Sequence, residues 1–547
     1  MTAETVQHII NVISERGSDA WWTDAEDEAA WIPFSLPPGK YRRGRDTMDV
    51  WFDSGTSWTQ LPQDRSPPAD VYIEGTDQHR GWFQSSLLTY VAKHSNSSSC
   101  TSPTAPYRTL ITHGFILDHL GRKMSKSIGN VIAPSQITDG TLLPPMKKRK
   151  GQSASDPPSY DAMGPDALRL WVASSDYTRD VMIGQPVLKS VNGLLHKLRV
   201  TFKWLLGALE DFDPSTISTV GSSSSSSPIT QRTFATQAAT HHLNLTLATT
   251  YSAYLAYEPY RAMIALTRYI NTHLSAFYFE YSKDLLYAGT TAQRREVQVM
   301  CWAILQGLTT MLAPVTPLLV REVVDCAPER VKAVLSKEAH DPFRRVWEAP
   351  AAEAQASSSK LASSASPSLP TTPQLSLPLD KALTLLDSAT SAVKAAQEIA
   401  RTARVMGSGL ECRVELRIPQ SPAQGEAASF FEELARSGEL EALLVVSGVD
   451  VVTVREGEIE IENESEKEGQ GWRYKQSFTV GNGTATAVIM PPTAAKCPRC
   501  WRYKAEQAEV DIPGPVSVGA DAKSTEPPKA MLCRRCEVAV EEQKGSE

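Results

Sequence analysis

Residues 121–130 read Gly-Arg-Lys-Met-Ser-Lys-Ser-Ile-Gly-Asn and place two lysines and two serines in one short polar stretch. The ammonium groups of Lys123 and Lys126 would neutralise charge that develops on phosphate oxygens, while Ser125 and Ser127 would donate hydrogen bonds. The flanking glycines let the backbone approach a ligand closely. These features predict a loop that binds a triphosphate. The alternative is a solvated basic turn, since lysine-rich turns are common.

A second polar group lies in residues 71–82, which read as a strand, a glycine-containing turn and the start of a helix. Ligands of open α/β sheets bind at the carboxyl ends of strands, so polar side chains here are well placed for a small molecule. Glu74 would hold an ammonium group, Asp77 and Gln78 would pair with ribose hydroxyls, and Gly75 permits close approach. Ordinary turn chemistry, such as capping of the helix by Asp77, is the alternative for any one of them.

Four of the eight cysteines form two Cys-x-x-Cys pairs, which are Cys497 with Cys500 and Cys533 with Cys536. This spacing predicts one tetrahedral zinc site, and four thiolate ligands would make the ion structural rather than catalytic. The insert 514–528 between the pairs is expected to loop out. Disulfides are the alternative, which the small share of cysteine in so long a chain disfavours. The other cysteines are expected to be inert packing residues: Cys100, Cys301, Cys326 and Cys412.

The elements that must position the first two groups follow from the spacing of apolar side chains. Short apolar runs at 49–52, 69–73 and 109–111 are typical of strands. They alternate with a helical pattern at 81–93, and this alternation predicts an α/β domain.

The rest of the chain shows helical periodicity followed by a mixed pattern. Apolar residues at three- and four-residue spacing predict a helical bundle, and later helix and strand patterns predict a small α+β region. The ranges are 166–174, 188–209 and 253–324 for the helices, then 381–406 for a further helix and 412–418 and 445–454 for strands.

A net charge of −7 over 547 residues argues against a protein that coats nucleic acid along its whole surface. RNA contacts would need local basic patches, such as residues 147–150 and the basic side chains around the cysteine pairs. The longest apolar stretch, 311–320, contains prolines and is too short to span a membrane. Residues 1–14 lack the pattern of a secretory or transit peptide. Three segments of biased amino-acid composition are expected to be linkers or solvated: 221–228, 351–378 and 455–468.

The order Lys-Met-Ser-Lys-Ser resembles the signature of class I aminoacyl-tRNA synthetases. Further segments resemble segments of isoleucyl-tRNA synthetases in their amino-acid sequence and in their order along the chain. These segments are 49–55, 74–82, 112–115, 121–130 and 166–173. The resemblance implies the second half of a Rossmann-like catalytic domain, a helical anticodon-binding domain, the α+β region and a bacterial-type zinc module that assists tRNA binding. The implied boundaries are 1–40 (tail of the editing insertion), 41–190 (catalytic), 191–350 (anticodon-binding), 351–380 (linker), 381–490 (α+β) and 491–547 (zinc module).

The same resemblance implies roles for residues at the strand ends. Glu74 would contact the isoleucyl-adenylate, whose ribose would be held by Gly75, Asp77 and Gln78. His113 and Gly114 resemble the strand end beside the adenine, although a lone histidine is more often structural.

Roles in the amino-acid pocket and at the phosphates are implied in the same way. Trp51 and Trp82 resemble the walls of the amino-acid pocket, for which plain core packing is an equal alternative. Lys126, and with it Lys123, would stabilise the ATP phosphates as the substrate carboxylate attacks the α-phosphorus. ATP would enter with Mg²⁺ as a substrate.

Two parts of the family pattern are absent from these 547 residues. The His-Ile-Gly-His motif, which grips ATP opposite the lysines, does not occur, and the editing insertion is absent apart from its tail at 1–40. We therefore expect the carboxyl-terminal portion of an isoleucine-tRNA ligase and expect this polypeptide alone to be inactive. The alternatives are an inactive truncated paralogue that acts as a tRNA-binding module, and a zinc-ribbon regulatory protein.

The expected partners are tRNA(Ile), ATP and L-isoleucine, with no membrane, and the complete protein is expected to be a monomer. Serine- and proline-rich insertions are typical of a nuclear-encoded eukaryotic protein, whereas the zinc module is of the bacterial type. Together these features favour the mitochondrial matrix over the cytoplasm.

Overall fold

The computed structural model describes residues 2–37, 39–62, 64–65, 67–95, 105–147, 157–217, 233–347, 377–420, 425–455, 471–481, 483–505 and 532–544. Several predicted segments lie outside these ranges: 148–150, 221–228, 456–468, 514–528, nearly all of 351–378, and Cys100. The chain divides into two compact units, Met1–Ile116 with Tyr177–Val181 and Leu117–Asp176 with Met182–Glu547. Within the described residues, no helix has the length and apolar character needed to cross a bilayer.

The first unit begins with a small helical cluster. Helix α1 (Ala3–Arg16) starts at Thr2, whose hydroxyl accepts a hydrogen bond from the backbone N–H of Thr5, and it ends at Gly17, where φ is 81°. This positive φ, with ψ at 162°, takes the backbone out of the helix, and glycine adopts it without strain. Two short elements follow, α2 (Ala20–Thr23) and η1 (Ala29–Trp31), and Trp31 packs against Val12 of α1.

The α/β part of the first unit is a parallel strand pair with a connecting helix. Strand β1 (Ala69–Gly75) pairs with β2 (Tyr107–His113), and η3 (Thr76–Arg80) and α4 (Trp82–His94) lie between them in sequence. Tyr72 and Phe83 are buried between the strands and α4. The predictions of strands at 69–73 and 109–111 and of a helix at 81–93 are confirmed.

The predicted strand at 49–52 is wrong, because these residues begin a helix. Asp49 accepts a hydrogen bond from the N–H of Trp51 (2.8 Å) and so starts α3 (Val50–Gly55), which η2 (Ser57–Gln60) follows. A capping carboxylate outweighs the β-propensity of Val, Trp and Phe when no neighbouring strand pairs with them. A Cβ atom at Gly55 would lie 2.9 Å from the Cβ of Ser85, so glycine allows α3 to approach α4 closely.

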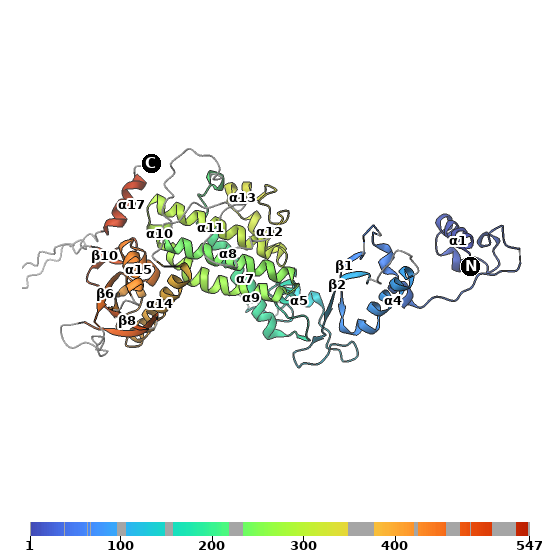
Figure 1. The fold of residues 1–547 in the computed structure, drawn as a ribbon, viewed down its shortest axis with the longest axis horizontal. Helices are drawn as coiled ribbons and strands as arrows, with labels where there is room; N and C mark the ends of the chain where they lie inside the picture. The colour runs from blue at the N-terminus through green and yellow to red at the C-terminus, as the bar shows by residue number, and fades with distance from the viewer. Residues whose placement is uncertain are drawn as a thin grey trace, which may run out of the picture. The chain divides into compact units, whose positions relative to one another are not determined.

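The second unit contains the helical bundle, whose members lie side by side in Figure 1. Its helices are α7 (Gln185–Ala208), α8 (Phe234–Leu255), α9 (Pro259–Arg268), α10 (Phe279–Ala288), α11 (Thr291–Leu312), α12 (Pro317–Asp325) and α13 (Glu329–Leu335), with η4 (Pro214–Thr216) and the π-helix η5 (Tyr269–Tyr278). Large apolar side chains such as Phe202 and Leu195 are fully buried between them. The predicted bundle is confirmed.

Helix α6 (Pro165–Ala173) joins the segment before the bundle to the bundle itself. The carboxylate of Asp166 accepts a hydrogen bond from the N–H of Leu319 (2.7 Å) at the start of α12, and Arg169 donates to the carbonyl oxygen of Val315 (2.9 Å). These contacts fix α6 on the bundle. Three shorter elements belong to the same part of the chain: β3 (Ile116–Leu117), α5 (Pro134–Thr138) and β4 (Val181–Met182).

The carboxyl-terminal part of the second unit is an α+β region and a small cysteine module. The sheet has the order β6-β5-β8-β7, in which β5 is parallel to β6 and antiparallel to β8. Helix α14 packs along β7 and β8, and α15 packs on β6. The bounds are α14 (Leu379–Thr402), η7 (Gly409–Glu411), β5 (Arg413–Pro419), α15 (Gly425–Arg436), α16 (Glu439–Leu444), β6 (Gly448–Val454), β7 (Tyr474–Val480) and β8 (Gly483–Met490).

The predicted α+β region is therefore confirmed, with shifted boundaries: the helix expected over 381–406 spans Leu379–Thr402. The strand expected over 445–454 starts only at Gly448, because Val445 ends α16 with φ 56°. The cysteine module consists of the hairpin β9 (Ala495–Lys496) and β10 (Tyr503–Ala505) with helix α17 (Arg534–Lys544).

Candidate functional site

The carboxyl ends of β1 and β2 bring together two of the predicted substrate-binding residues. The register places Gly75 opposite His113, so Glu74 and His113 lie at the same edge, called here the strand edge. The His113 Nε2 atom lies 3.7 Å from Glu74 Oε2, and the Gly75 N–H donates a hydrogen bond to the same oxygen (2.8 Å). Both side chains are about half exposed, so a ligand would reach the carboxylate from solvent.

Asp77 and Gln78 follow in η3, beside the strand edge. The Gln78 Oε1 atom accepts a hydrogen bond from the Trp82 N–H (3.0 Å), and its Nε2 donates to Asp77 Oδ2 (3.3 Å). The side chain that binds the first amide of α4 is thus Gln78 and not Asp77. A Cβ at Gly75 would lie 2.6 Å from Asp77 Oδ1, so a side chain at that position would displace the Asp77 carboxylate.

The two tryptophans behave differently. Trp82 stacks on Tyr72, with ring centroids 4.4 Å apart, and its Nε1 donates to the carbonyl oxygen of Ser54 (2.9 Å). Trp51 remains 46% exposed, and its ring lies where a Cβ at Gly81 would approach to 2.9 Å. Trp82 thus helps to join α3, α4 and β1, while Trp51 presents apolar surface at the start of α4.

Gly114 follows β2 where another segment of the first unit comes very close. Its N–H donates to the carbonyl oxygen of Tyr177 (2.9 Å), and the next N–H, from Phe115, donates to Asp180 Oδ1 (2.7 Å). A Cβ at Gly114 would lie 2.4 Å from the backbone of Arg179, so any other residue would displace this segment. Close packing therefore explains why residue 114 is glycine, independently of its predicted place beside adenine.

Residues 121–130, called here the lysine loop, belong to the second unit. Two glycines with left-handed backbone, Gly121 at 75° and Gly129 at 71°, mark its bends. Lys123 and Lys126 are exposed, whereas the hydroxyl oxygens of Ser125 and Ser127 lie 3.1 Å apart within the loop. The Ser125 hydroxyl also accepts from the Ile128 N–H, so the serines shape the loop as well as offering hydroxyls to a ligand.

A buried carboxylate that the sequence analysis missed holds the lysine loop together. Asp118 Oδ1 accepts from the N–H groups of Leu120 and Arg122 (2.9 Å each), and Oδ2 accepts from Asn130 Nδ2 (3.0 Å). Asn130 in turn accepts from the Ser125 N–H (2.9 Å). The hydrogen bond from Asn130 and that from the Arg122 backbone hold the pKa of Asp118 well below its usual value, against the opposing effect of burial.

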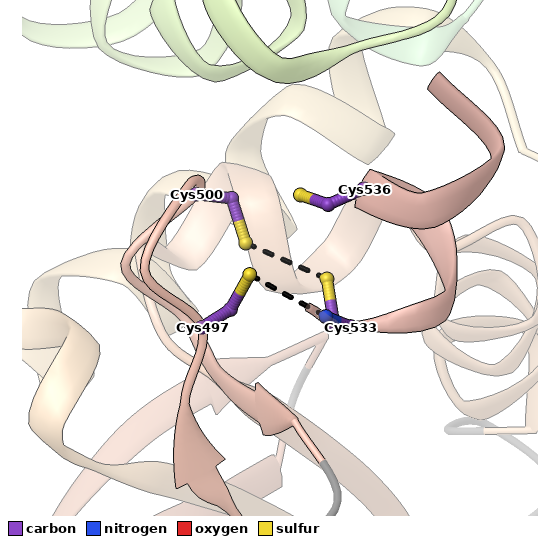
Figure 2. A group of neighbouring side chains, drawn as sticks. All are labelled: Cys497, Cys500, Cys533 and Cys536. Atoms are coloured by element: carbon purple, nitrogen blue, oxygen red, sulfur yellow. Dashed lines mark hydrogen bonds between the residues drawn. The ribbon is translucent and has the colours of Figure 1, made fainter. Parts of the chain in front are cut away.

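The four paired cysteines come together, as their spacing predicts. Cys497 and Cys500 lie in the turn of the β9–β10 hairpin, and Cys533 and Cys536 lie at the start of α17 (Figure 2). All four sulfur atoms lie within 4.8 Å of one another. Cys497, Cys533 and Cys536 are buried and Cys500 is half-buried.

The geometry of this cysteine cluster fits a tetrahedral metal ion. A tetrahedron with metal–sulfur bonds of about 2.3 Å has sulfur–sulfur edges of about 3.8 Å. The Sγ atoms of Cys500 and Cys533 lie 3.7 Å apart. The Cys533 N–H also points at Cys497 Sγ, at 3.4 Å (Figure 2). The cluster therefore needs little rearrangement to bind zinc.

The thiols of the cysteine cluster do not ionise equally. Burial raises the pKa of Cys497, but N–H groups of Cys500, Cys533 and Arg499 outweigh burial and lower that pKa to about 6. Burial and the nearby thiols of Cys500 and Cys533 instead raise the pKa of Cys536. Ionisation is therefore easier for Cys497 than for Cys536, and a bound cation would favour the Cys536 thiolate.

Comparison with known proteins decides the family. The family model of class I tRNA synthetases (I, L, M and V) matches residues 1–184, and that of the anticodon-binding domain of tRNA ligases matches residues 236–416. This chain belongs to the class I tRNA synthetases. Both the strand edge and the lysine loop of the synthetase fall inside the first match, whereas the cysteine cluster falls outside both.

The curated relatives of this synthetase chain are named isoleucine–tRNA ligases. The chloroplastic/mitochondrial enzyme of Arabidopsis thaliana is 32% identical over 92% of this chain and 42% of its own length. Enzymes of a Cyanothece species and of Gloeobacter violaceus are 32% and 33% identical over 99% and 98% of this chain, and over 49% and 46% of their own lengths. The chain thus spans about half the length of the relatives it matches.

Proposed function

We propose that this chain takes part in the ATP-dependent ligation of L-isoleucine to tRNA(Ile). In the first step an isoleucine carboxylate oxygen attacks the α-phosphorus of ATP, the bond to pyrophosphate breaks, and isoleucyl-adenylate forms. In the second step a ribose hydroxyl of the tRNA attacks the isoleucyl carbonyl carbon and AMP leaves. The observation that carries the proposal is the lysine loop, in which a buried aspartate and an asparagine hold two exposed lysines ready for phosphates.

The charged residues would bind the parts of the substrates that carry the opposite charge. Lys126 and Lys123 would neutralise the phosphate oxygens, together with the Mg²⁺ that accompanies ATP, as negative charge moves to the departing pyrophosphate. Ser125 and Ser127 would add hydrogen bonds. At the strand edge, the exposed Glu74 carboxylate has the charge that an amino-acid ammonium group requires.

The remaining strand-edge residues would hold the adenosine part and the side chain. Asp77 and the backbone at Gly75 would contact the ribose, with Gln78 holding Asp77 in place through their hydrogen bond. His113 and Gly114 would lie beside adenine. Trp51 offers the apolar surface that a branched aliphatic side chain needs.

We infer that the cysteine cluster binds one structural zinc ion per chain. Four sulfur ligands would fill the coordination sphere, so the ion would stabilise the cysteine module and leave no position for a substrate. Cys497, Cys500, Cys533 and Cys536 would all bind as thiolates. The bound ion would supply folding energy.

The helical bundle would bind tRNA, since the matched anticodon-binding model covers most of it. We propose a monomer in the mitochondrial matrix, with the cytoplasm as the alternative. The name of the Arabidopsis relative, which includes both organelles, supports an organellar site.

Isoleucine-dependent exchange of pyrophosphate into ATP tests the function. The assay would use the 547-residue chain alone and the chain joined to the amino-terminal part of an isoleucine–tRNA ligase, with isoleucine, valine and leucine supplied separately. We expect the joined protein to prefer isoleucine and the chain alone to be inactive. A preference for leucine would overturn the substrate. Tight binding of tRNA(Ile) without exchange in either form would favour a tRNA-binding module instead.

A further inference from the structure

One buried carboxylate of the helical bundle contacts both halves of the cysteine module. Asp284 lies in α10, and its side chain is only 12% exposed. Its two oxygens accept two parallel hydrogen bonds from Arg535, at 2.7 and 2.8 Å. The Oδ2 atom also accepts from Arg502 Nε, at 3.2 Å. Asp284 is therefore saturated by two guanidinium groups in a site almost closed to water.

The two arginines that bind Asp284 belong to different cysteine pairs. Arg535 lies between Cys533 and Cys536 at the start of α17, whereas Arg502 follows Cys500 by two residues in the hairpin turn. Each arginine is thus tied by the backbone to a different cysteine pair. Asp284 therefore fixes both cysteine pairs relative to one point on α10.

Further hydrogen bonds hold the same arrangement. Arg502 also donates to the carbonyl oxygen of Val446 (2.6 Å), and Arg499, in the first pair, donates to the carbonyl oxygen of Cys536 (3.2 Å), in the second. Without Asp284, two largely buried guanidinium groups would lose their carboxylate, and charged groups left buried without a partner are costly. The hairpin and α17 would then lose the carboxylate that joins them, and the Arg499 hydrogen bond to Cys536 would remain.

We propose that Asp284 is a positioning residue of the metal centre, which aligns the two cysteine pairs so that four sulfur atoms converge before a metal arrives. The proposal rests on the zinc site proposed above. Residues that orient metal ligands from outside the coordination sphere typically change metal affinity by about 10- to 100-fold. Because binding linkage is reciprocal, a bound metal would in turn hold the cysteine module on α10.

The test compares Asp284→Asn with the unaltered 547-residue chain. Zinc affinity would be measured by competition with a chromogenic chelator, and coordination by the absorption of Co²⁺ bound in place of zinc. We expect the variant to bind zinc about 10- to 100-fold more weakly, with a Co²⁺ spectrum that still shows four sulfur ligands. The matched control is Glu280→Gln, since Glu280 lies on the same helix and pairs only with Lys283 in an exposed contact among the described residues. That control should bind zinc normally.

A second measurement separates positioning from simple loss of folding. Amide hydrogen exchange of residues 279–288 should become faster in the unaltered chain when zinc is removed, but should already be fast in Asp284→Asn and respond little to zinc. Arg535→Lys, which keeps the charge and loses the paired hydrogen bonds, should give an intermediate zinc affinity. Wild-type zinc affinity in Asp284→Asn would overturn the proposal. Failure of the unaltered chain to bind zinc would instead overturn the zinc site itself.

Discussion

Asp118 and Asn130 are twelve residues apart, and the 3.0 Å hydrogen bond between their side chains joins the segment just before the lysine loop to the last residue of the loop. The same carboxylate accepts two backbone N–H groups at the start of the loop, and Asn130 accepts the N–H of Ser125 in its middle. Two exposed lysines are thus presented by a loop whose backbone is fixed from inside. Order of this kind lowers the entropy lost when phosphates bind.

Replacing the buried carboxylate should therefore open the loop. In Asp118→Ala the backbone N–H groups of Leu120 and Arg122 and the amide of Asn130 lose their acceptor. We expect trypsin to cut within residues 121–130 at least about tenfold faster, because cleavage follows the population of the opened segment. Limited proteolysis followed by mass spectrometry would locate the cuts. Asp325→Ala, which removes an exposed carboxylate paired with Arg321, should leave the loop resistant.

Lys126 is expected to act on the chemical step. In the joined protein described above, Lys126→Ala should slow isoleucyl-adenylate formation by about 10²- to 10³-fold. The reason is that the departing pyrophosphate loses the stabilising ammonium group of Lys126. Binding of tRNA(Ile) should stay near normal. Lys189→Ala, at an exposed position of α7, serves as the control for loss of a surface lysine in the exchange assay. Unchanged adenylate formation with lost tRNA binding would identify the lysine loop as an RNA contact.

Removal of one cysteine of the cluster should release the metal. Elemental analysis of the purified chain should find one zinc, and Cys533→Ser should find close to none, because a buried sulfur ligand is lost. Structural zinc is worth about 10 to 16 kcal/mol in small fingers, so the cysteine module should loosen while the rest of the chain stays folded. Cys326→Ser, which alters an exposed cysteine, should keep the zinc. Absence of zinc from the reduced, unaltered chain would refute the assignment.

Glu439 should make stability depend on pH. Its carboxylate accepts a hydrogen bond from the Ala235 N–H (3.3 Å) at the start of α8. Burial, and to a smaller extent the like charge of Glu296, raise the pKa of Glu439 from 4.5 to about 7. The folded chain therefore holds this proton more tightly than the unfolded chain. The resulting stabilisation is complete below about pH 4.5 and is lost as the pH rises to about 7.

Glu439→Gln keeps the acceptor and cannot ionise. It should be more stable than the unaltered chain at pH 8 by roughly 2 to 3 kcal/mol, and the difference should nearly vanish at pH 4.5. Urea unfolding at the two pH values measures the effect. Glu432→Gln, an exposed position on α15, should show no such trend. An equal gain at both pH values would mean that the effect does not come from ionisation of Glu439.

Local pattern was enough to predict the strands of the strand edge and the helices of the bundle. It failed at 49–52, where the capping bond from Asp49 decides between helix and strand. It also missed α15, α16, β7 and β8, although the buried residues of α15, which include Ala427, Phe430 and Leu434, recur at helical spacing and could have been recognised. The residues that form the strand edge could be chosen from the sequence, but the 3.7 Å approach of Glu74 and His113 depends on strand register.

The missed positioning residues show where sequence reasoning ends. Asp118 stands before a glycine turn, and an aspartate there is a recognisable turn signal, so a closer reading of 118–121 would have selected it. Asp284 gives no such signal, because its partners Arg502 and Arg535 are 218 and 251 residues away. The cysteine pairs could be predicted to meet only because a shared metal supplies the reason for two distant segments to converge.

Ala505 ends the hairpin of the cysteine module and Leu532 lies just before α17, yet both residues pack against the same cysteine cluster. Both ends of the intervening sequence are thus held beside the same four sulfur atoms. Lengthening a loop whose ends are already held together costs little, about 0.6 kcal/mol for each doubling. This position is therefore a permissive insertion point, where a fluorescent or affinity domain could be grafted to report on the synthetase without disturbing either the strand edge or the lysine loop.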